Sequence, residues 1–128
     1  MKRLLITGSR MWDDWFIPYY ALAAEWYLTK GLAVLVSGNC PPRMDGTPGA
    51  DYICEQIWES WGSTVERYPA RWDLYGTAAG FRRNGEMVAL EGIYKCLAFN
   101  IDNSNGTANC VEQARKHHIP VSPFEKWS

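Results

Sequence analysis

Short apolar runs alternate along the chain with longer segments of helical periodicity. Residues 32–36 read Leu-Ala-Val-Leu-Val, a continuous apolar run that is typical of a parallel strand covered on both faces. Four further runs predict strands over residues 3–7, 64–68, 95–99 and 119–122. Pro120 places the last of these at a sheet edge or a strand start, because proline donates no ladder hydrogen bond.

Apolar side chains recur at helical spacing between these runs. The first periodic segment carries Pro18 in its opening turn and meets Gly31 at its end, as helices often do. Three more segments predict helices over residues 50–61, 77–90 and 107–117. Thr107 is the expected cap of the last helix. Residues 70–76 predict an ordered loop, because they are too aromatic for a flexible linker.

This alternation of strands and helices predicts a single fold class. It indicates a Rossmann-like α/β protein, a three-layer α/β/α sandwich with a mostly parallel five-stranded sheet and right-handed crossovers. The 128 residues suit one domain spanning residues 1–128.

Charge and composition narrow the range of partners. The formal net charge is −1 and no long basic run is present, which disfavours nucleic acid as the main partner. Seven Trp and seven Tyr are many for this length. Such side chains fill cores, ligand clefts or subunit interfaces, so we expect a homodimer.

Neither targeting signals nor metal motifs stand out. The apolar run after Lys2-Arg3 is far too short for a signal peptide, and no segment is long enough to span a bilayer, so the expected location is the cytoplasm. The four cysteines lack Cys-x-x-Cys spacing and are interpreted as reduced and structural, without a metal. His117 and His118 are adjacent at a helix end and therefore point in different directions, which disfavours a metal or catalytic role.

Small and capping residues follow three of the predicted strands. They are Gly8-Ser9-Arg10, Ser37-Gly38 and the segment from Ser104 to Gly106-Thr107. Carboxyl ends of parallel strands share one edge of the sheet, where open α/β folds bind ligands. Taken singly, each is also an ordinary turn or helix cap. Together they predict an anion pocket lined by backbone N–H groups.

Arginines supply charge that complements an anion. Arg10 follows the first glycine turn, and Arg83 stands beside Asn84 in the third predicted helix. A guanidinium binds phosphate through two parallel hydrogen bonds. Neighbouring Arg82 is interpreted as part of a solvated helix face. Four aromatic residues could stack on a base or pack in the core: Trp12, Trp72, Tyr75 and Phe81.

These residues, in their order, resemble the YspA/YpsA-related branch of the SLOG superfamily, small Rossmann-like domains common in actinobacteria and their phages. The resemblance covers nearly the whole chain. Its marks are Gly8-Ser9-Arg10 with Trp12, Ser37-Gly38, Gly49-Ala50-Asp51, Pro69-Ala70-Arg71-Trp72, Gly76-Thr77-Ala78-Ala79-Gly80, Arg83-Asn84 with Met87, Gly106-Thr107 and Ile119-Pro120-Val121.

The resemblance implies a nucleotide-derived ligand. No cofactor is expected. In the Lonely Guy enzymes of this superfamily, an arginine and a glutamate just after Gly-Thr cleave the glycosidic bond of nucleoside monophosphates. Arg83, with Met87 four residues on, matches the first element, but the first acid after Thr107 is Glu112, too far along the helix. Asp102 or Asp51 would have to replace it as a catalytic acid.

A further departure is the segment 39–48, which replaces a short glycine-rich link of the family. It could form a lid, alter the ligand, or be a surface elaboration.

Three functions follow for comparison. The preferred one is a sensor or sequestering protein for a phosphorylated nucleotide or an NAD- or ADP-ribose-derived molecule. The alternatives are a hydrolase of N-glycosidic or phosphoribosyl bonds and, less favoured by the charge, a single-stranded DNA-binding protein. The predicted ligand-binding residues are Gly8, Ser9, Arg10, Trp12, Ser37, Gly38, Gly49, Asp51, Trp72, Arg83, Asn84, Ser104, Gly106 and Thr107.

Overall fold

The computed structural model describes residues 1–127. Its strands are β1 (Arg3–Gly8), β2 (Val34–Ser37), β3 (Val65–Arg67), β4 (Ile93–Ile101) and β5 (Val121–Lys126). Its helices are α1 (Phe16–Thr29), α2 (Ala50–Ser60), α3 (Trp72–Tyr75), α4 (Ala79–Val88) and α5 (Asn105–Lys116), with a 3₁₀ turn over Gly76–Ala78.

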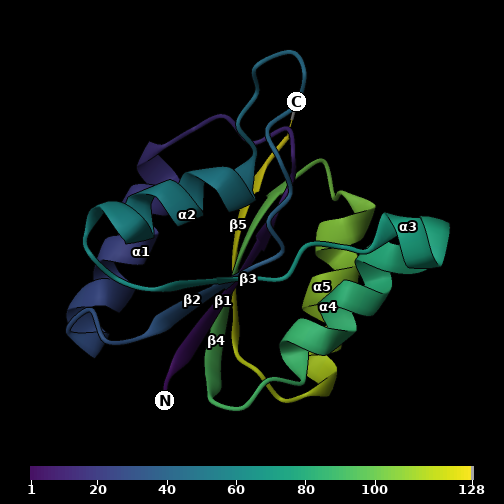
Figure 1. Ribbon diagram of the computed structural model, residues 1–128. Helices are drawn as coiled ribbons and strands as arrows, with labels where there is room; N and C mark the ends of the chain where they lie inside the picture. Colours follow the sequence, from purple (N-terminus) through teal and green to yellow (C-terminus); the bar gives the residue numbers. More distant parts are fainter. Residues whose placement is uncertain (128) are drawn as a thin grey trace.

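The strands form one sheet in the order β3-β2-β1-β4-β5, and every neighbouring pair is parallel. Helices α1 and α2 cover one face, while α3, α4 and α5 lie on the other side (Figure 1). The predicted Rossmann-like three-layer sandwich is therefore confirmed, with an all-parallel sheet. β5 is an edge strand, which accommodates Pro123 within it.

Two apolar clusters lie on opposite faces of the sheet. Successive side chains of a strand point to opposite faces, so Leu4 and Ile6 pack with Trp58 of α2, whereas Leu5 packs with Met87 of α4. All five of these side chains are essentially inaccessible to solvent. The continuous apolar character of the central strands follows from this double coverage.

Helix boundaries differ from the sequence-based expectations at two places. Residues 70–76 contain the short helix α3, whose turn is closed by hydrogen bonds from the N–H groups of Leu74 and Tyr75 to the Arg71 carbonyl. α5 begins two residues before Thr107, with Ser104 at the N-cap position, so the prediction of Thr107 as the cap was wrong. In both places the sequence lacks a long apolar period that would fix the first turn.

The cysteines at residues 40, 54, 96 and 110 are all free thiols, and only Cys40 is partly accessible among them. Within residues 1–127, no helix has the length and apolar content that a membrane crossing requires.

Candidate functional site

A cleft opens at the carboxyl ends of the strands, where the chain changes direction. β1 and β4 are neighbours, but the helices that follow them, α1 and α5, lie on opposite faces of the sheet. Such a divergence leaves a crevice between the two connections, the usual ligand position in open α/β sheets. The cleft here has a volume of about 430 Å³.

Most of the predicted ligand-binding residues meet in this cleft. They come from β1 and its following loop, the loop after β2, and helices α2 to α5. Those that line it are Gly8, Ser9, Arg10, Gly38, Asp51, Trp72, Arg83, Asn84, Ser104, Gly106 and Thr107. Eleven predicted positions from six segments of the chain thus share one cavity.

The loop after β1 forms one wall and is fixed by backbone hydrogen bonds. The Ser9 carbonyl accepts hydrogen bonds from the N–H groups of Trp12 and Ala50, and the Ser9 hydroxyl oxygen accepts one from Met11. Gly8 is required by packing rather than by a ligand, because a Cβ there would overlap Ala50 and the Phe99 carbonyl. The wall is therefore rigid before any ligand arrives.

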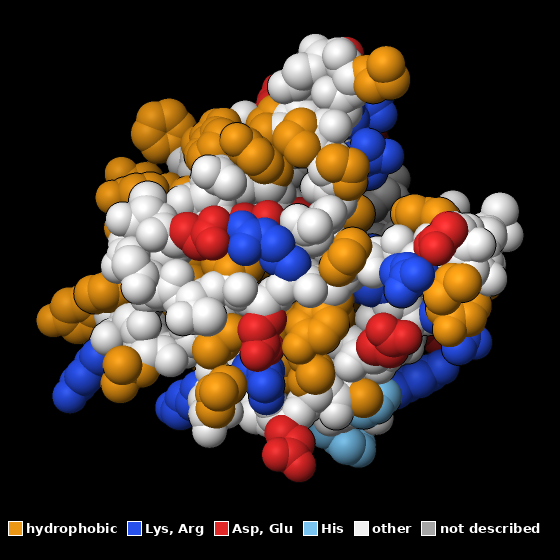
Figure 2. Space-filling model, in the orientation of Figure 1, with side chains coloured by type: hydrophobic (Ala, Val, Ile, Leu, Met, Phe, Trp, Pro, Cys, Tyr) orange, Lys and Arg blue, Asp and Glu red, His pale blue; other side chains and the backbone are white. Residues whose placement is uncertain are grey.

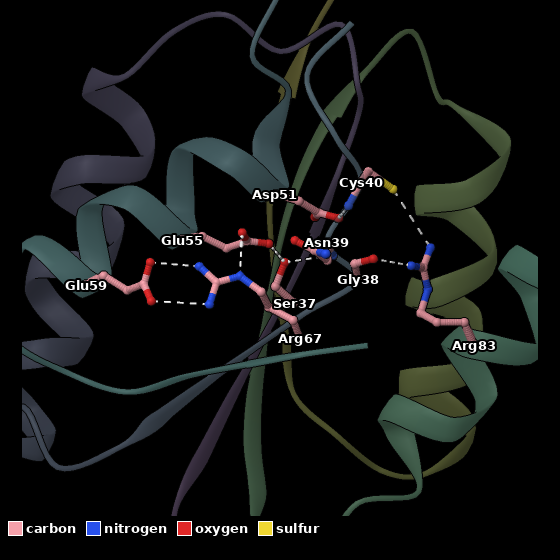
Figure 3. Close-up of polar contacts among 9 residues, drawn as sticks. All are labelled: Ser37, Gly38, Asn39, Cys40, Asp51, Glu55, Glu59, Arg67 and Arg83. Atoms are coloured by element: carbon pink, nitrogen blue, oxygen red, sulfur yellow. Dashed lines mark hydrogen bonds and ion pairs between the residues drawn. The ribbon is translucent and has the colours of Figure 1, made fainter. Parts of the chain in front are cut away.

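Arg83 lies on the opposite wall with its guanidinium already oriented (Figure 3). Its Nη1 donates to the carbonyls of Gly38 and Tyr68, and its Nε donates to Asn84 Oδ1 at 3.0 Å. These acceptors are neutral, and within residues 1–127 no carboxylate forms an ion pair with Arg83. Arg83 therefore has no direct ion-pair partner among the described residues, and Asp51 acts on it only through space.

Asp51 is a buried carboxyl group in the same cleft. Its side chain accepts a hydrogen bond from the Cys40 N–H at 3.0 Å. Burial is the main cause that raises its pKa to about 6, and the charge of Glu55 adds to this, while the Cys40 N–H and Arg83 oppose it. A carboxyl group of this kind holds a proton close to neutral pH and can donate it.

Cys40 places its thiol between Asp51 and Arg83. Its Sγ lies 4.0 Å from Arg83 Nη2. Burial and the neighbouring Asp51 raise the thiol pKa to about 11, although Arg83 acts in the opposite direction. The group is therefore a neutral S–H at physiological pH and lacks the thiolate that a nucleophile needs.

A second polar network, formed with side chains of α2 and β3, fixes the loop after β2. The Ser37 hydroxyl donates to buried Glu55 at 2.6 Å and accepts a hydrogen bond from the Asn39 N–H. Glu55 also pairs with Arg67 at 3.0 Å, and Arg67 forms a two-pronged contact with Glu59 (Figure 3). The network fixes the start of the loop that carries Gly38 and Cys40.

The N-terminus of α5 closes one end of the cleft. Its N-cap residue, Ser104, makes no side-chain capping hydrogen bond and instead directs its hydroxyl to Thr107 Oγ1 at 2.9 Å. Asn84 reaches across from α4 to the Gly106 carbonyl at 3.3 Å. The first N–H groups of a helix lack intrahelical partners, so this end offers donors and partial positive charge to an anion.

Aromatic and apolar side chains form the mouth of the cleft. Trp72 and Phe81 line the mouth and are at least half exposed, and Met11 lines it from the other wall. Tyr75 lies outside the lining and packs under Arg82, whose guanidinium sits 4.0 Å from the ring centre. Trp72 and Phe81 are therefore the exposed aromatic rings at the mouth of the cleft.

Four predicted site residues lie elsewhere. Trp12 is fully buried in the core, with its ring edge-on to Phe99 and its indole N–H bonded to the Asp14 carbonyl. Ser37 is fully buried and is engaged by Glu55. Gly49 holds the loop after β1, because its N–H donates to the Trp12 carbonyl.

Asp102 is the fourth of these residues. It is exposed at the end of β4, its N–H donates to the Lys126 carbonyl, and it is not among the residues that line the cleft in the described part of the chain. Of the two substitute acids, Asp51 alone therefore lies in the cavity. Glu112 pairs with Lys116 at 3.2 Å on the exposed side of α5.

Besides Phe81, which was considered as a stacking ring, seven residues that line the cleft are absent from the predicted ligand-binding set: Ile6, Thr7, Met11, Cys40, Thr77, Gly80 and Met87. Cys40 follows the second strand end by only three residues, and that proximity was the available signal. The segment 39–48 rises as a loop above this end of the sheet (Figure 1). Only Cys40 of that segment lines the cleft, and the tip residue Met44 is fully exposed.

Fold and site together define the chain as a Rossmann-like α/β protein with a cleft of mixed polar and apolar lining at the reversal point of its sheet. No protein-family model matches it. It is 40% identical over 129 residues to the Gene 61 protein of Mycobacterium phage D29, with 97% of each chain covered. The chain belongs to the family of that protein. The expectation of a relative in a phage is thereby confirmed.

Proposed function

We propose that the chain binds a phosphorylated nucleotide or a nucleotide-derived molecule in this cleft, as a sensor or sequestering protein. One observation carries the proposal: three features lie together in the cleft. They are Arg83, which has no ion-pair partner among the described residues, the N-terminus of α5, which has no side-chain cap, and the exposed rings of Trp72 and Phe81. Guanidinium and helix N–H groups suit a phosphate, and aromatic faces suit a base.

The size of the cavity supports a ligand of this class. Small-molecule sites occupy about 300–1,000 Å³, and the cleft of about 430 Å³ falls within that range. Arg10 adds a second cation at the rim, where its guanidinium makes only a long contact of 3.4 Å with the Pro41 carbonyl. The cleft thus contains two arginines and one buried carboxyl group, Asp51, and this balance of charge favours an anionic ligand.

A thermal-shift panel of AMP, ADP, ADP-ribose, NAD and cyclic ADP-ribose isomers tests the proposal. A ligand at one hundred times its Kd stabilises the fold by about 2.7 kcal/mol, which shifts the Tm on the order of 10 °C for a chain of this size. We expect Arg83→Ala to weaken binding about 10- to 100-fold, because it removes a charge-assisted contact.

Arg82→Ala is the matched control, since Arg82 precedes Arg83 in α4 but does not line the described cleft. It should bind as the wild type does. Undiminished affinity in Arg83→Ala would contradict the placement of the site. No shift with any member of the panel would contradict the ligand class and direct attention to oligonucleotides, whose binding would weaken steeply with salt.

A second candidate is a hydrolase that cleaves an N-glycosidic or phosphoribosyl bond. Asp51 favours it, because a buried acid with a pKa of about 6 can protonate a leaving group at neutral pH. Mass spectrometry of each mixture would then reveal a free base, and Asp51→Asn would abolish its release while ligand binding persists. A ligand recovered intact supports the sensor.

We also propose that the family lies within the SLOG superfamily. Its support is the marks in the sequence together with the positions of Arg83, Asn84, Gly106 and Thr107 around one cleft. The departures are the missing acid after Thr107 and the 39–48 loop.

A further inference from the structure

The outer face of α1 carries an apolar stripe that faces solvent. Phe16, Tyr20, Tyr27 and Leu28 recur at helical spacing and are 67% to 81% exposed. Leu32, just beyond the helix, is 81% exposed. Hydrophobic side chains gather at the upper left of Figure 2, where Figure 1 places α1 and α2.

Within α1 no charged group interrupts this stripe, and beyond the helix the exposed Lys30 lies between Leu28 and Leu32 in the sequence. The one charged residue of α1, Glu25, points inward, where it accepts hydrogen bonds from the Tyr94 hydroxyl at 3.0 Å and Lys95 Nζ at 2.9 Å. The solvent-facing side of α1 is therefore apolar, whereas the solvent-facing side of a surface helix normally carries its polar and charged residues. The sheet covers the inner side, and the outer side is left exposed.

A groove beside the stripe adds shape to the surface. Ala23, Trp26 and Tyr27 of α1 and Trp61 after α2 line an open surface hollow of about 430 Å³. Its walls are held in place, because the Trp26 indole N–H donates to Ser63 Oγ at 3.0 Å and the Trp26 and Trp61 rings meet edge to face. The surface thus combines projecting rings with a hollow that such a ring can enter.

We propose that this α1 face, defined by the stripe and the groove, is the contact surface between two copies of the chain. Five side chains of this size, about three-quarters exposed, present roughly 700–800 Å², which matches the ~800 Å² that each partner buries in a stable interface. In a two-fold pair each copy offers the same surface, so rings of one enter the groove of the other.

The scarcity of charge on the stripe, where Lys30 is the one charged residue between Phe16 and Leu32 that is exposed, favours a second copy as the occupant. A nucleic acid or an acidic protein would need basic groups, and a membrane-surface helix needs a Lys- and Arg-rich polar face, whereas the opposite face of α1 packs on the sheet. The proposed contact also lies away from α4 and α5, so the cleft stays open in the pair (Figure 1).

Sedimentation velocity of the full chain from about 1 µM to about 500 µM tests the proposal. We expect a dimer, and we expect Tyr20→Glu/Tyr27→Glu to raise its dissociation constant at least about 100-fold, because two buried charges would replace aromatic anchors. Glutamate is a good helix former and both positions are exposed, so the fold should persist, as circular dichroism would verify.

Met44→Glu/Leu74→Glu is the matched control, with the same charge change at exposed apolar positions away from α1. It should associate as the wild type does. A wild type that stays monomeric throughout the range, or a Tyr20/Tyr27 variant that associates like the control, overturns the proposal. So does a monomer that co-sediments with neutral phosphatidylcholine vesicles, which would make a lipid surface the occupant. Arg83→Ala should leave association unchanged, so this test is separate from that of the cleft.

Discussion

The buried carboxyl group of Asp51 should make the stability of the protein depend on pH in a way that one substitution removes. Its pKa is about 6 in the folded protein and 3.8 in an unperturbed chain. Between these two values the folded protein holds a proton that the unfolded chain has released. The stabilisation is therefore fully present below pH 4 and is lost as the pH rises through 6.

The magnitude follows from the difference of about two pKa units. At about 1.4 kcal/mol per unit, ionised Asp51 costs the folded state roughly 3 kcal/mol above pH 6.5. Asp51→Asn removes this cost, while the amide oxygen can still accept the hydrogen bond from the Cys40 N–H. We expect the variant to match the wild type near pH 4 and to exceed its free energy of unfolding by up to about 3 kcal/mol at pH 7.5.

Urea unfolding at half-unit steps from pH 4 to pH 8 measures this difference directly. Other carboxylates, including Glu59 and Glu66, have lowered pKa values and shift stability in the opposite sense, but they are common to both proteins and cancel in the comparison. Asp13→Asn removes an exposed carboxylate and serves as the control. If the difference in the free energy of unfolding between Asp51→Asn and the wild type stayed constant with pH, the claim that burial raises the pKa of Asp51 would be refuted.

Three further substitutions test the framework of the site. Gly106→Ala should raise the Tm slightly and the free energy of unfolding by up to about 1 kcal/mol, because no atom lies within 4 Å of the added methyl group. The same substitution should weaken the binding of a ligand at the start of α5. Gly8→Ala should cost at least about 2 kcal/mol in urea unfolding, since its Cβ would overlap Ala50 and a backbone carbonyl, and a neutral outcome would mean that α2 moves freely. Glu55→Gln should cost about 2–4 kcal/mol by weakening the buried contacts to Ser37 and Arg67, whereas Glu59→Gln, at the exposed end of the same network, should cost less than about 1 kcal/mol; equal losses would contradict this division.

The sequence allowed the sheet and most of the cleft to be predicted because both follow from local patterns. Apolar runs such as 32–36 mark strands covered on both faces, and glycine or serine at the strand ends marks the edge where the chain turns. Parallel strands then bring Ser9, Gly38 and Gly106 together although they are far apart in sequence.

The direction in which each side chain points was harder to predict. Ser37 and Gly38 are adjacent, yet Ser37 turns toward α2 and Glu55, and only Gly38 lines the cleft, because successive positions at a strand end face opposite ways. Trp12 lies in a loop without periodicity, so its burial against Phe99 depended on distant packing. Met11 and Cys40 were missed for the same reason.

The hydrogen bonds of Arg83 to Gly38, Tyr68 and Asn84 have a consequence for the speed and selectivity of recognition. A flexible surface arginine loses rotamer freedom when it captures an anion, whereas this side chain has already lost it during folding, so capture carries little entropic penalty. The same tethering restricts how far the guanidinium can follow a ligand. Because Nε and Nη1 are already engaged, an anion would have to approach the guanidinium through Nη2, in an orientation that the tether sets. Under the proposed function, Arg83 would therefore select a ligand by the direction from which its acceptor atoms can approach.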